Sequence, residues 1–132
     1  SLKEIVISPH NSARGMDPHQ GAVLLHDGNT GELRALLNAS AVTEVRTAAV
    51  SAVATRLLAR HDSRVVAVIG AGVQGRSHIE AMRCVLPDAE VRLWSRGAER
   101  AAELAAATGA TNVGTIEEAL AGADVVCTTT SA

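Results

Sequence analysis

The sequence predicts an α/β protein in which a parallel sheet with flanking helices follows a smaller α+β part. Two observations predict this class. Val65–Ile69 is a continuous apolar run of mostly β-branched residues, as in a strand that a parallel sheet buries on both faces. Strand-like and helix-like segments then alternate to the end of the 132 residues, which is typical of βαβ units. We therefore expect a doubly wound parallel sheet in the C-terminal part.

The N-terminal part carries the signals of a strand, a hairpin and a long helix. Turn-forming residues separate two strand-like runs, which indicates a β-hairpin. Pro9 ends the strand that precedes them. The expected elements are a strand at 3–8, a loop at 11–20, hairpin strands at 21–26 and 33–37 with a turn at 27–31, and a helix at 41–60.

The long helix is expected to have Ser40 as its N-cap and to end before residues 61–63, which break its pattern. Apolar residues recur along it at helical spacing and predict a buried stripe. The stripe consists of Val42, Val45, Ala49, Ala52, Val53 and Leu57. We place the domain boundary after this helix, so that residues 1–61 form part of a substrate and dimerisation domain and residues 62–132 part of a second domain.

The C-terminal part shows clear start and stop signals. Gly109 follows a segment rich in Ala and Glu and is expected to end that helix. Thr115 and Glu118 have the spacing of a capping box at the start of a later helix. The expected elements after the first strand are helices at 73–85, 97–107 and 115–121, strands at 90–94 and within 123–130, and a short strand or connector at 112–114.

Three glycines directly after the buried strand match G-x-G-x-x-G, namely Gly70, Gly72 and Gly75. The first permits the tight turn, the second lets a pyrophosphate approach the backbone, and the third lets the helix pack close to the strand. The helix that begins here points its unpaired N–H groups toward the phosphates. Because a strand precedes the pattern and a helix follows it, we predict the N-terminal half of a dinucleotide-binding Rossmann domain rather than an ordinary glycine-rich turn.

The end of the second strand of this unit indicates which dinucleotide is preferred. NAD-binding units usually place a carboxylate there, which bonds the ribose 2′-hydroxyl. This sequence has Ser95 and Arg96 instead, with Arg100 one helical turn later. A hydroxyl and a planar guanidinium bind a 2′-phosphate, which a carboxylate would repel. We expect NADP(H); NAD(H) is the alternative if the arginines are solvated charges balanced by Glu99 and Glu103.

Arg46 is unusual because a cation in the second turn of a helix opposes the helix dipole. The residues that follow it, 47–49, are small and leave room for a ligand. A bound anion, such as a substrate carboxylate or a cofactor phosphate, would resolve the electrostatic conflict. The alternative is a surface arginine whose stem lies over the apolar stripe.

The composition excludes several classes of function. A net charge of −2, a pI near 6.2 and a single aromatic residue, Trp94, argue against nucleic-acid binding. No apolar run is long enough to span a membrane. The two cysteines, Cys84 and Cys127, are expected to be buried, reduced thiols of a cytoplasmic protein. The five histidines lack metal-ligand spacing, so we expect no metal site, and His78 is expected to be an ordinary helix-face residue.

Several short motifs occur together along the whole chain. They are Lys3 with Pro9 and Asn11, Gly15, Gln20-Gly21, Leu25, Asp27, Thr30-Gly31, Arg46-Thr47-Ala48-Ala49, Ser51-Ala52, Gly70-Ala71-Gly72-Val73-Gln74, Trp94-Ser95-Arg96 and residues 128–131. In this combination the sequence resembles the ornithine cyclodeaminase/mu-crystallin family. The pairing of Arg46-Thr47-Ala48-Ala49 with the glycine fingerprint at this distance is the most specific part of the resemblance.

The resemblance implies roles for individual residues. Lys3 would be the active-site lysine near the reacting carbon, and Arg46 the arginine that holds the substrate carboxylate. The implied cofactor residues are Gly70, Gly72, Val73 and Gln74 at the pyrophosphate, Ser95 and Arg96 at the 2′-phosphate, and Thr130 and Ser131 near the nicotinamide. A homodimer is implied too. The catalytic aspartate of the family would lie beyond residue 132, and a further substrate arginine before residue 1, so we expect the chain to be part of a longer polypeptide.

The resemblance also implies the class of reaction. We expect an oxidoreductase that passes hydride between NADP(H) and a small amino acid or cyclic imine carboxylate, as a ketimine reductase does. Ornithine cyclodeamination, in which the hydride returns and ammonia is lost, is the first alternative. A protein that binds small ligands in a cofactor-dependent way is an alternative of another class.

Overall fold

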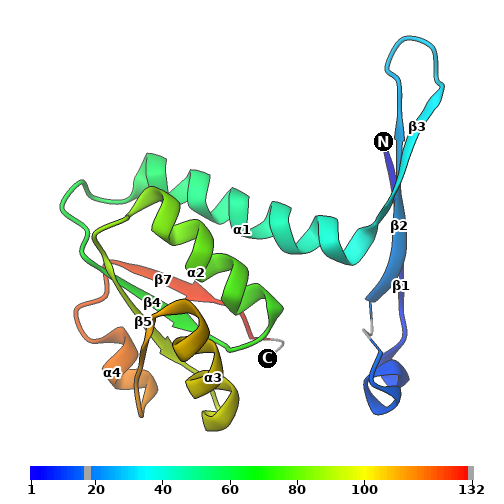
Figure 1. Ribbon diagram of the computed structural model, residues 1–132. Helices are drawn as coiled ribbons and strands as arrows, with labels where there is room; N and C mark the ends of the chain where they lie inside the picture. The colour runs from blue at the N-terminus through cyan, green and yellow to red at the C-terminus, as the bar shows by residue number, and fades with distance from the viewer. Residues whose placement is uncertain (17–18, 131–132) are drawn as a thin grey trace. The chain divides into compact units, whose positions relative to one another are not determined.

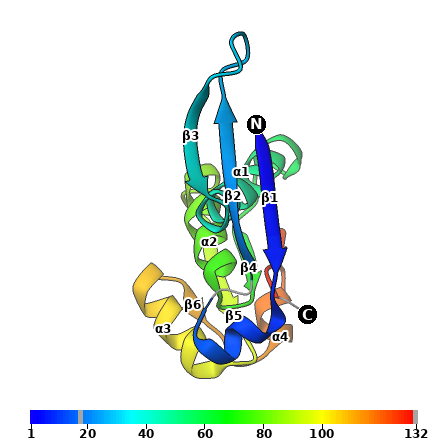
Figure 2. The ribbon, with the colours of Figure 1, turned by 90° about the vertical axis from the view of Figure 1, so that its right-hand side faces the viewer.

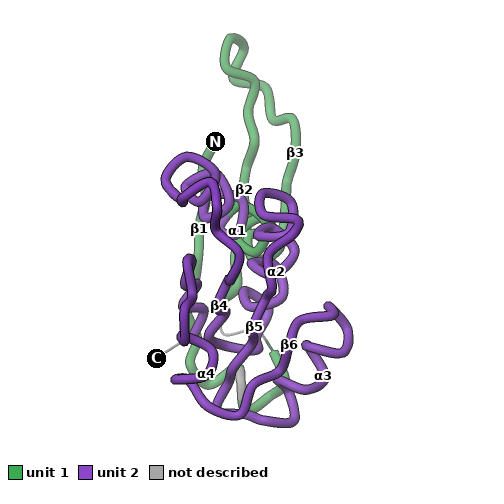
Figure 3. The backbone as a smooth tube through the Cα atoms, turned by 90° about the vertical axis from the view of Figure 1, so that its left-hand side faces the viewer, with its two compact units in different colours: residues 1–46 green, residues 47–132 purple. Residues whose placement is uncertain are grey.

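The computed structural model describes residues 1–16 and 19–130 and contains two separate β-sheets. Each sheet belongs to its own compact unit, Ser1–Arg46 and Thr47–Ala132 (Figure 3). The units therefore divide inside a helix, α1 (Ala39–Leu58). The domain boundary expected from the sequence, between residues 61 and 62, follows the end of this helix and stays a prediction.

The first unit is built on an antiparallel sheet with the strand order β1-β2-β3 (Figure 1). Its strands are β1 (Leu2–Ile7), β2 (His19–His26) and β3 (Leu33–Asn38). The expected hairpin of β2 and β3 is confirmed. The loop expected at 11–20 is partly wrong, because Pro9–Arg14 forms a 3-10 helix and β2 begins at His19. Turn-forming residues are compatible with both structures, since a 3-10 helix is a series of tight turns.

The turn of the hairpin is organised by Asp27. Its carboxylate accepts the backbone N–H groups of Asn29 and Thr30, at 2.9 and 3.1 Å, and forms an ion pair with Arg34. These backbone hydrogen bonds and the Arg34 guanidinium lower the pKa of Asp27. Gly31 supplies the left-handed backbone, with φ of +74°, that closes the turn.

Helix α1 begins two residues earlier than expected, at Ala39, and its N-cap is not Ser40. The side chain of Asn38 accepts the backbone N–H of Ala41 at 3.0 Å, which is the hydrogen bond of an N-cap residue. The Ser40 hydroxyl instead donates to the His19 carbonyl of β2 at 2.8 Å. Both residue types suit a cap, and the end of the preceding strand decides between them.

The predicted apolar stripe of α1 is mostly not buried in this structure. Val45 and Leu57 are 69% and 72% exposed, whereas Ala48 and Ala52 are 2% and 8% exposed. Because α1 carries apolar residues on more than one side, helical spacing does not say which side packs. The side that packs here carries small residues, which let neighbouring elements approach closely.

The second unit is a four-stranded parallel sheet with the order β6-β5-β4-β7, flanked by helices (Figures 1 and 2). Taken in chain order, this is the 3-2-1-4 arrangement with which a doubly wound sheet begins. Its elements are β4 (Val65–Ile69), α2 (Val73–Val85), β5 (Glu90–Trp94), α3 (Ala98–Thr108), β6 (Thr111–Asn112), α4 (Ile116–Leu120) and β7 (Val125–Thr128). The predicted fold class, a partial Rossmann domain after part of an α+β domain, is confirmed.

The central strand β4 is buried on both faces, as its apolar run predicts. Val66 and Val68 face a core formed with α2 and α3, which Ala52 of α1 also joins. The alternate residues, Ala67 and Ile69, face a smaller core beneath α4. A strand whose successive side chains point to opposite faces needs apolar residues at every position when both faces are covered.

Three expectations about single residues have different outcomes. Cys127 in β7 is buried, and burial raises the pKa of its thiol. Cys84 is exposed, because α2 packs through positions at helical spacing, from Gly75 to Met82, that do not include residue 84. His78, expected to be an ordinary helix-face residue, is one of these packing positions and is only 6% exposed.

Asp124 ties the beginnings of two neighbouring strands together. Its carboxylate accepts the backbone N–H groups of Arg64 and Val65, at 2.7 and 3.0 Å, and pairs with the Arg60 guanidinium. The two backbone hydrogen bonds are the main cause of its lowered pKa, and Arg60 lowers the pKa further. The carboxylate thus joins the start of β4 to the turn before β7.

We expect Asp124→Asn to destabilise the protein at neutral pH, because the amide brings no charge to these hydrogen bonds. Since the folded-state pKa of Asp124 is lowered, its stabilising effect is present above the unfolded value near 3.8 and is lost as the pH falls through the folded value. Unfolding temperatures measured across this range should converge at the acid end. Asp62→Asn is the control, because Asp62 is a more exposed partner of the same Arg60 guanidinium. Equal effects of the two substitutions would contradict the assignment.

Candidate functional site

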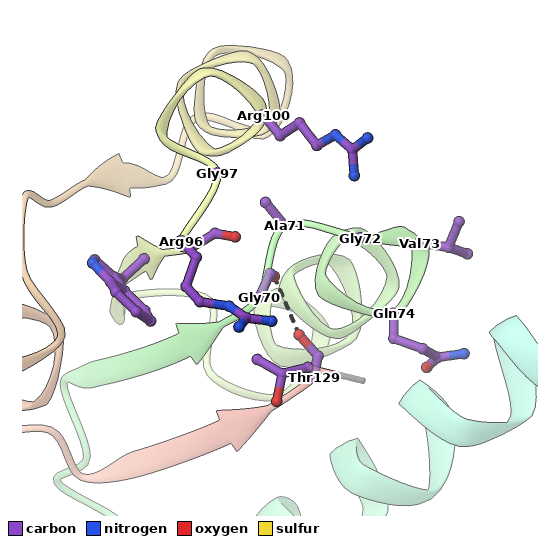
Figure 4. Close-up of a pocket in the computed structure, with 12 residues that line it drawn as sticks. Gly70, Ala71, Gly72, Val73, Gln74, Arg96, Gly97, Arg100 and Thr129 are labelled. Carbon is purple, nitrogen blue, oxygen red and sulfur yellow. Dashed lines mark hydrogen bonds between the residues drawn. The ribbon is translucent and has the colours of Figure 1, made fainter. Parts of the chain in front are cut away.

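The carboxyl ends of β4, β5 and β7 surround a crevice of about 510 Å³. It lies where the strand order reverses, because β5 is on one side of β4 and β7 on the other. Ligands of doubly wound sheets bind at this switch point. The crevice is lined by Gly70, Ala71, Gly72, Val73, Gln74, Trp94, Ser95, Arg96, Gly97, Arg100, Thr129 and Thr130 (Figure 4).

The structure brings the sequence-predicted cofactor residues together in this crevice. Those that line it are Gly70, Gly72, Val73, Gln74, Ser95, Arg96 and Thr130. Ser131 lies outside the described residues. Their roles as ligands of a cofactor stay a prediction.

The fold requires glycine at two of the three fingerprint positions and not at the third. Gly70 has φ of +120°, and a Cβ there would lie 2.8 Å from the Thr129 hydroxyl oxygen. A Cβ on Gly75 would lie 2.1 Å from the Gly70 carbonyl oxygen. A Cβ on Gly72 would meet no atom of the described residues within 4 Å, its chain neighbours apart, and Gly72 has an ordinary φ of −92°. The fold therefore requires Gly70 and Gly75, whereas the space in front of Gly72 is open on the crevice side.

The first turn of α2 presents unpaired polar groups at the crevice. Its N-cap residue is Gly72, and no side chain caps the helix there. The first backbone N–H groups of a helix have no partner within the helix and attract anions. The side-chain oxygen of Gln74 is buried and has no hydrogen-bond partner among the described residues. The N–H groups suit a phosphate-bearing ligand, whereas the Gln74 oxygen can only accept a hydrogen bond.

Two arginines lie at the side of the crevice formed by β5 and α3. Arg96 follows β5 and Arg100 lies in the first turn of α3, and Figure 4 shows both side chains extending toward the side where the glycine turn lies. In the part of the chain that the structure describes, neither forms an ion pair, and Glu99 and Glu103 do not pair with them. No carboxylate follows β5 at 95–97, where an NAD-type unit usually places one.

Thr129, which the sequence did not single out as a site residue, connects β7 to the glycine turn. Its backbone N–H donates to the Ile69 carbonyl at 2.8 Å, and its hydroxyl lies 3.0 and 3.2 Å from the carbonyl oxygens of Ile69 and Gly70 (Figure 4). One sequence signal points to it, since carboxyl ends of parallel strands meet at one edge and Thr129 follows the strand that pairs with β4.

The first unit places Lys3 next to the helical turn that carries Arg46. Lys3 is half-buried on β1 and its ammonium donates to the hydroxyl of Thr43 on α1. Thr43 in turn donates to the Ala39 carbonyl at 2.7 Å, which orients it. Arg46 lies one turn after Thr43, so the two share a face of the helix.

Arg46 itself is exposed and lines a shallow groove of about 450 Å³ with otherwise mainly apolar residues of β3 and α1. No acidic side chain among residues 1–16 and 19–130 forms an ion pair with Lys3 or Arg46. The expected convergence of these two cations on one substrate stays a prediction.

Among the described residues, no group of three or more His, Cys, Asp or Glu side chains is arranged to hold a metal ion. None of the described helices combines the length and the apolar character that crossing a bilayer requires.

Comparison with known proteins relates the chain to one family. The family model described as "Ornithine cyclodeaminase/mu-crystallin family" matches residues 1–132. Ketimine reductase mu-crystallin of Mus musculus is 41% identical over 100% of this chain, which spans 43% of that protein. The chain thus covers about two fifths of the length of such relatives.

Two solved structures share the fold along nearly the whole chain. The first is the Thermococcus litoralis Δ1-pyrroline-2-carboxylate reductase in complex with NADH and L-proline, at 30% identity, with a TM-score of 0.80 over 96% of this chain and 41% of that one. The second is an archaeal alanine dehydrogenase dimer with bound NAD, at 30% identity, with a TM-score of 0.87 over 98% and 41%. With a family model that matches every residue, the chain belongs to the ornithine cyclodeaminase/mu-crystallin family.

Proposed function

We propose that the complete protein is a ketimine reductase-type oxidoreductase, which transfers hydride between NADP(H) and a small amino acid or cyclic imine carboxylate. The observation that carries the proposal is the crevice at the switch point, with open space before Gly72 and two arginines that form no ion pair within residues 1–16 and 19–130. Membership of a family that includes reductases of imine carboxylates supports it.

The crevice residues fit a dinucleotide. The pyrophosphate would lie at Gly70, Gly72, Val73 and the backbone N–H of Gln74, while Thr130 and Ser131 would face the nicotinamide. The nicotinamide supplies or accepts the hydride when bound. In the reductive direction the imine carbon gains a hydride and the nitrogen a proton, which yields the amino acid and the oxidised cofactor.

We propose that Arg46 and Lys3 act on the substrate. The guanidinium of Arg46 would hold the carboxylate with two parallel hydrogen bonds, which also offsets the unfavourable place of this cation near the N-terminus of α1. The Lys3 ammonium, held by Thr43, would polarise or orient the reacting carbon. Neither cation has an acidic partner among the described residues, so both are free to meet an anion.

Assembly and location are part of the proposal. Large apolar side chains of the first sheet are exposed, including Leu2, Ile7 and Leu36, each more than half exposed. Such a surface favours association, and an archaeal structural neighbour is a dimer. We propose a homodimer, and a cytoplasmic location since both cysteines are free thiols.

We expect the protein to bind NADPH more tightly than NADH, and Arg96→Ala to remove most of the difference. A lost charge-assisted hydrogen bond costs about 1.5–3 kcal/mol, which corresponds to roughly 10-fold to 150-fold in the Kd for NADPH. Titration of both cofactors against both proteins measures the ratio. If wild type binds the two equally, or Arg96→Ala leaves the ratio unchanged, the NADP(H) assignment is wrong. Arg76→Ala, on an exposed residue of α2 outside the crevice lining, is the control.

The activity is tested by mixing the complete protein with Δ1-pyrroline-2-carboxylate and NADPH, where we expect oxidation of one cofactor for each imine reduced. Release of ammonia from ornithine without net oxidation of the cofactor would instead indicate a cyclodeaminase. Tight cofactor binding without either reaction would favour a binding protein.

A further inference from the structure

The interface between α1 and α2 in the second unit contains a buried polar contact that none of the roles above uses. His78 lies on α2 and is 6% exposed, which makes it the one buried histidine among the described residues. Its Nδ1 is 2.7 Å from the Gln74 carbonyl oxygen, and its Nε2 is 3.0 Å from the Ser51 hydroxyl of α1. We infer that His78 is a positioning residue that, through Ser51, holds the first turn of α2 in place for the dinucleotide; this inference rests on the proposed cofactor binding.

The hydrogen-bond pattern fixes how the ring is oriented. A carbonyl oxygen can only accept, so Nδ1 carries a proton and donates to Gln74. In this tautomer Nε2 accepts a hydrogen bond from the Ser51 hydroxyl. The same hydroxyl lies 3.3 Å from the Thr47 carbonyl oxygen of its own helix. The side chain of Ser51 therefore joins the ring to α1.

The contact lies at the end of α2 that faces the crevice. Gln74 lines the crevice and is one turn before His78, so the ring holds the carbonyl of a residue in the proposed pyrophosphate turn. Thr47 is likewise one turn before Ser51 on α1, and the two helices run side by side in the same general direction (Figure 1). The Thr47 hydroxyl and the Gln74 side-chain oxygen are both buried without a partner among the described residues.

Losing these hydrogen bonds would be costly, because the imidazole is buried. His78 is one of the buried residues of α2, together with Gly75, Ile79 and Met82, and a buried imidazole needs both of its hydrogen bonds. A displacement of the first turn of α2 would break them. The ring thus restricts the first turn of α2 to one position. Less conformational entropy is then lost when a dinucleotide binds to this turn.

A second hydrogen bond from a side chain of α2 to a neighbouring helix provides a matched control. At the other end of α2, the Arg83 guanidinium donates to the Thr108 carbonyl at the end of α3. In both cases one side chain of α2 bonds a neighbouring helix, but only the His78 contact lies one turn from a residue that lines the crevice. A purely structural role predicts similar effects of losing either, whereas a positioning role predicts that only loss of the His78 contact weakens the cofactor complex.

The experiment measures the Kd of NADPH and the unfolding temperature of the complete protein for wild type, Ser51→Ala, His78→Leu, the double variant and Arg83→Met. We expect Ser51→Ala and His78→Leu each to weaken binding by about threefold to tenfold, the range for one lost neutral hydrogen bond. The double variant should be no weaker than His78→Leu alone, because one contact is removed in both. Arg83→Met should lower the unfolding temperature and leave the Kd unchanged.

Rescue gives an independent check, since His78→Gln keeps a group that can bond Ser51 and should retain more affinity than His78→Leu. Equal loss of affinity in Arg83→Met, additive effects in the double variant, or an unchanged Kd in Ser51→Ala would overturn the inference. If wild type itself binds neither NADPH nor NADH, the proposed function fails and this inference fails with it.

Discussion

Replacing Gly72 by valine should abolish dinucleotide binding and leave the protein folded. Among the described residues, a Cβ at this position meets no atom within 4 Å apart from those of its chain neighbours, and the φ of −92° suits any L-residue. Valine is a poorer N-cap than glycine, which costs about 1 kcal/mol of stability. The added methyl groups would occupy the space in which a pyrophosphate meets the backbone. Circular dichroism and titration with NADPH measure the two effects separately.

The neighbouring Gly75 provides the contrast. A Cβ there would be 2.1 Å from the Gly70 carbonyl oxygen, so Gly75→Ala should impair folding itself. A folded Gly72→Val protein with unchanged cofactor affinity would contradict the assignment of the glycine fingerprint to dinucleotide binding. A Gly75→Ala protein as stable as wild type would contradict the packing described here.

Substitution of Arg46 should mainly weaken substrate binding, whereas substitution of Lys3 should mainly slow turnover. In the complete enzyme, Arg46→Lys should raise the KM by roughly 10-fold to 100-fold, because a point charge replaces a guanidinium fork that bonds the carboxylate twice. Lys3→Met should lower kcat more than it changes KM, if the ammonium acts on the reacting carbon. Steady-state kinetics with an imine carboxylate and NADPH measure both parameters.

Two further variants sharpen this test. Thr43→Val removes the hydroxyl that holds the Lys3 ammonium and should reproduce part of the loss in kcat. Arg56→Lys changes an exposed arginine near the end of the same helix and should leave both parameters unchanged. If Arg46→Lys behaves like Arg56→Lys, Arg46 is a surface residue of a structural helix and the substrate site lies elsewhere.

The sequence determined by itself those features that depend on residues close together in the chain. The run Val65–Ile69 is apolar at every position and mostly β-branched, which favours a strand covered on both faces. Thr115 and Glu118 form the predicted capping box, and Gly109 ends α3 in the left-handed conformation. Their partners are within a few residues, so spacing alone reveals them. The family resemblance, now shown, likewise rested on short motifs.

Tertiary structure decided every feature whose partner is distant in the sequence. Asn38 rather than Ser40 caps α1, because the strand end places Asn38 there and engages Ser40 with His19. The packing side of α1 is the one with small residues, a choice that apolar spacing leaves open. His78 acquires its role from Ser51, 27 residues earlier in the chain, and Thr129 from Gly70, 59 residues earlier. Periodicity tells which residues share a face, but which face packs depends on the whole set of elements competing for one core.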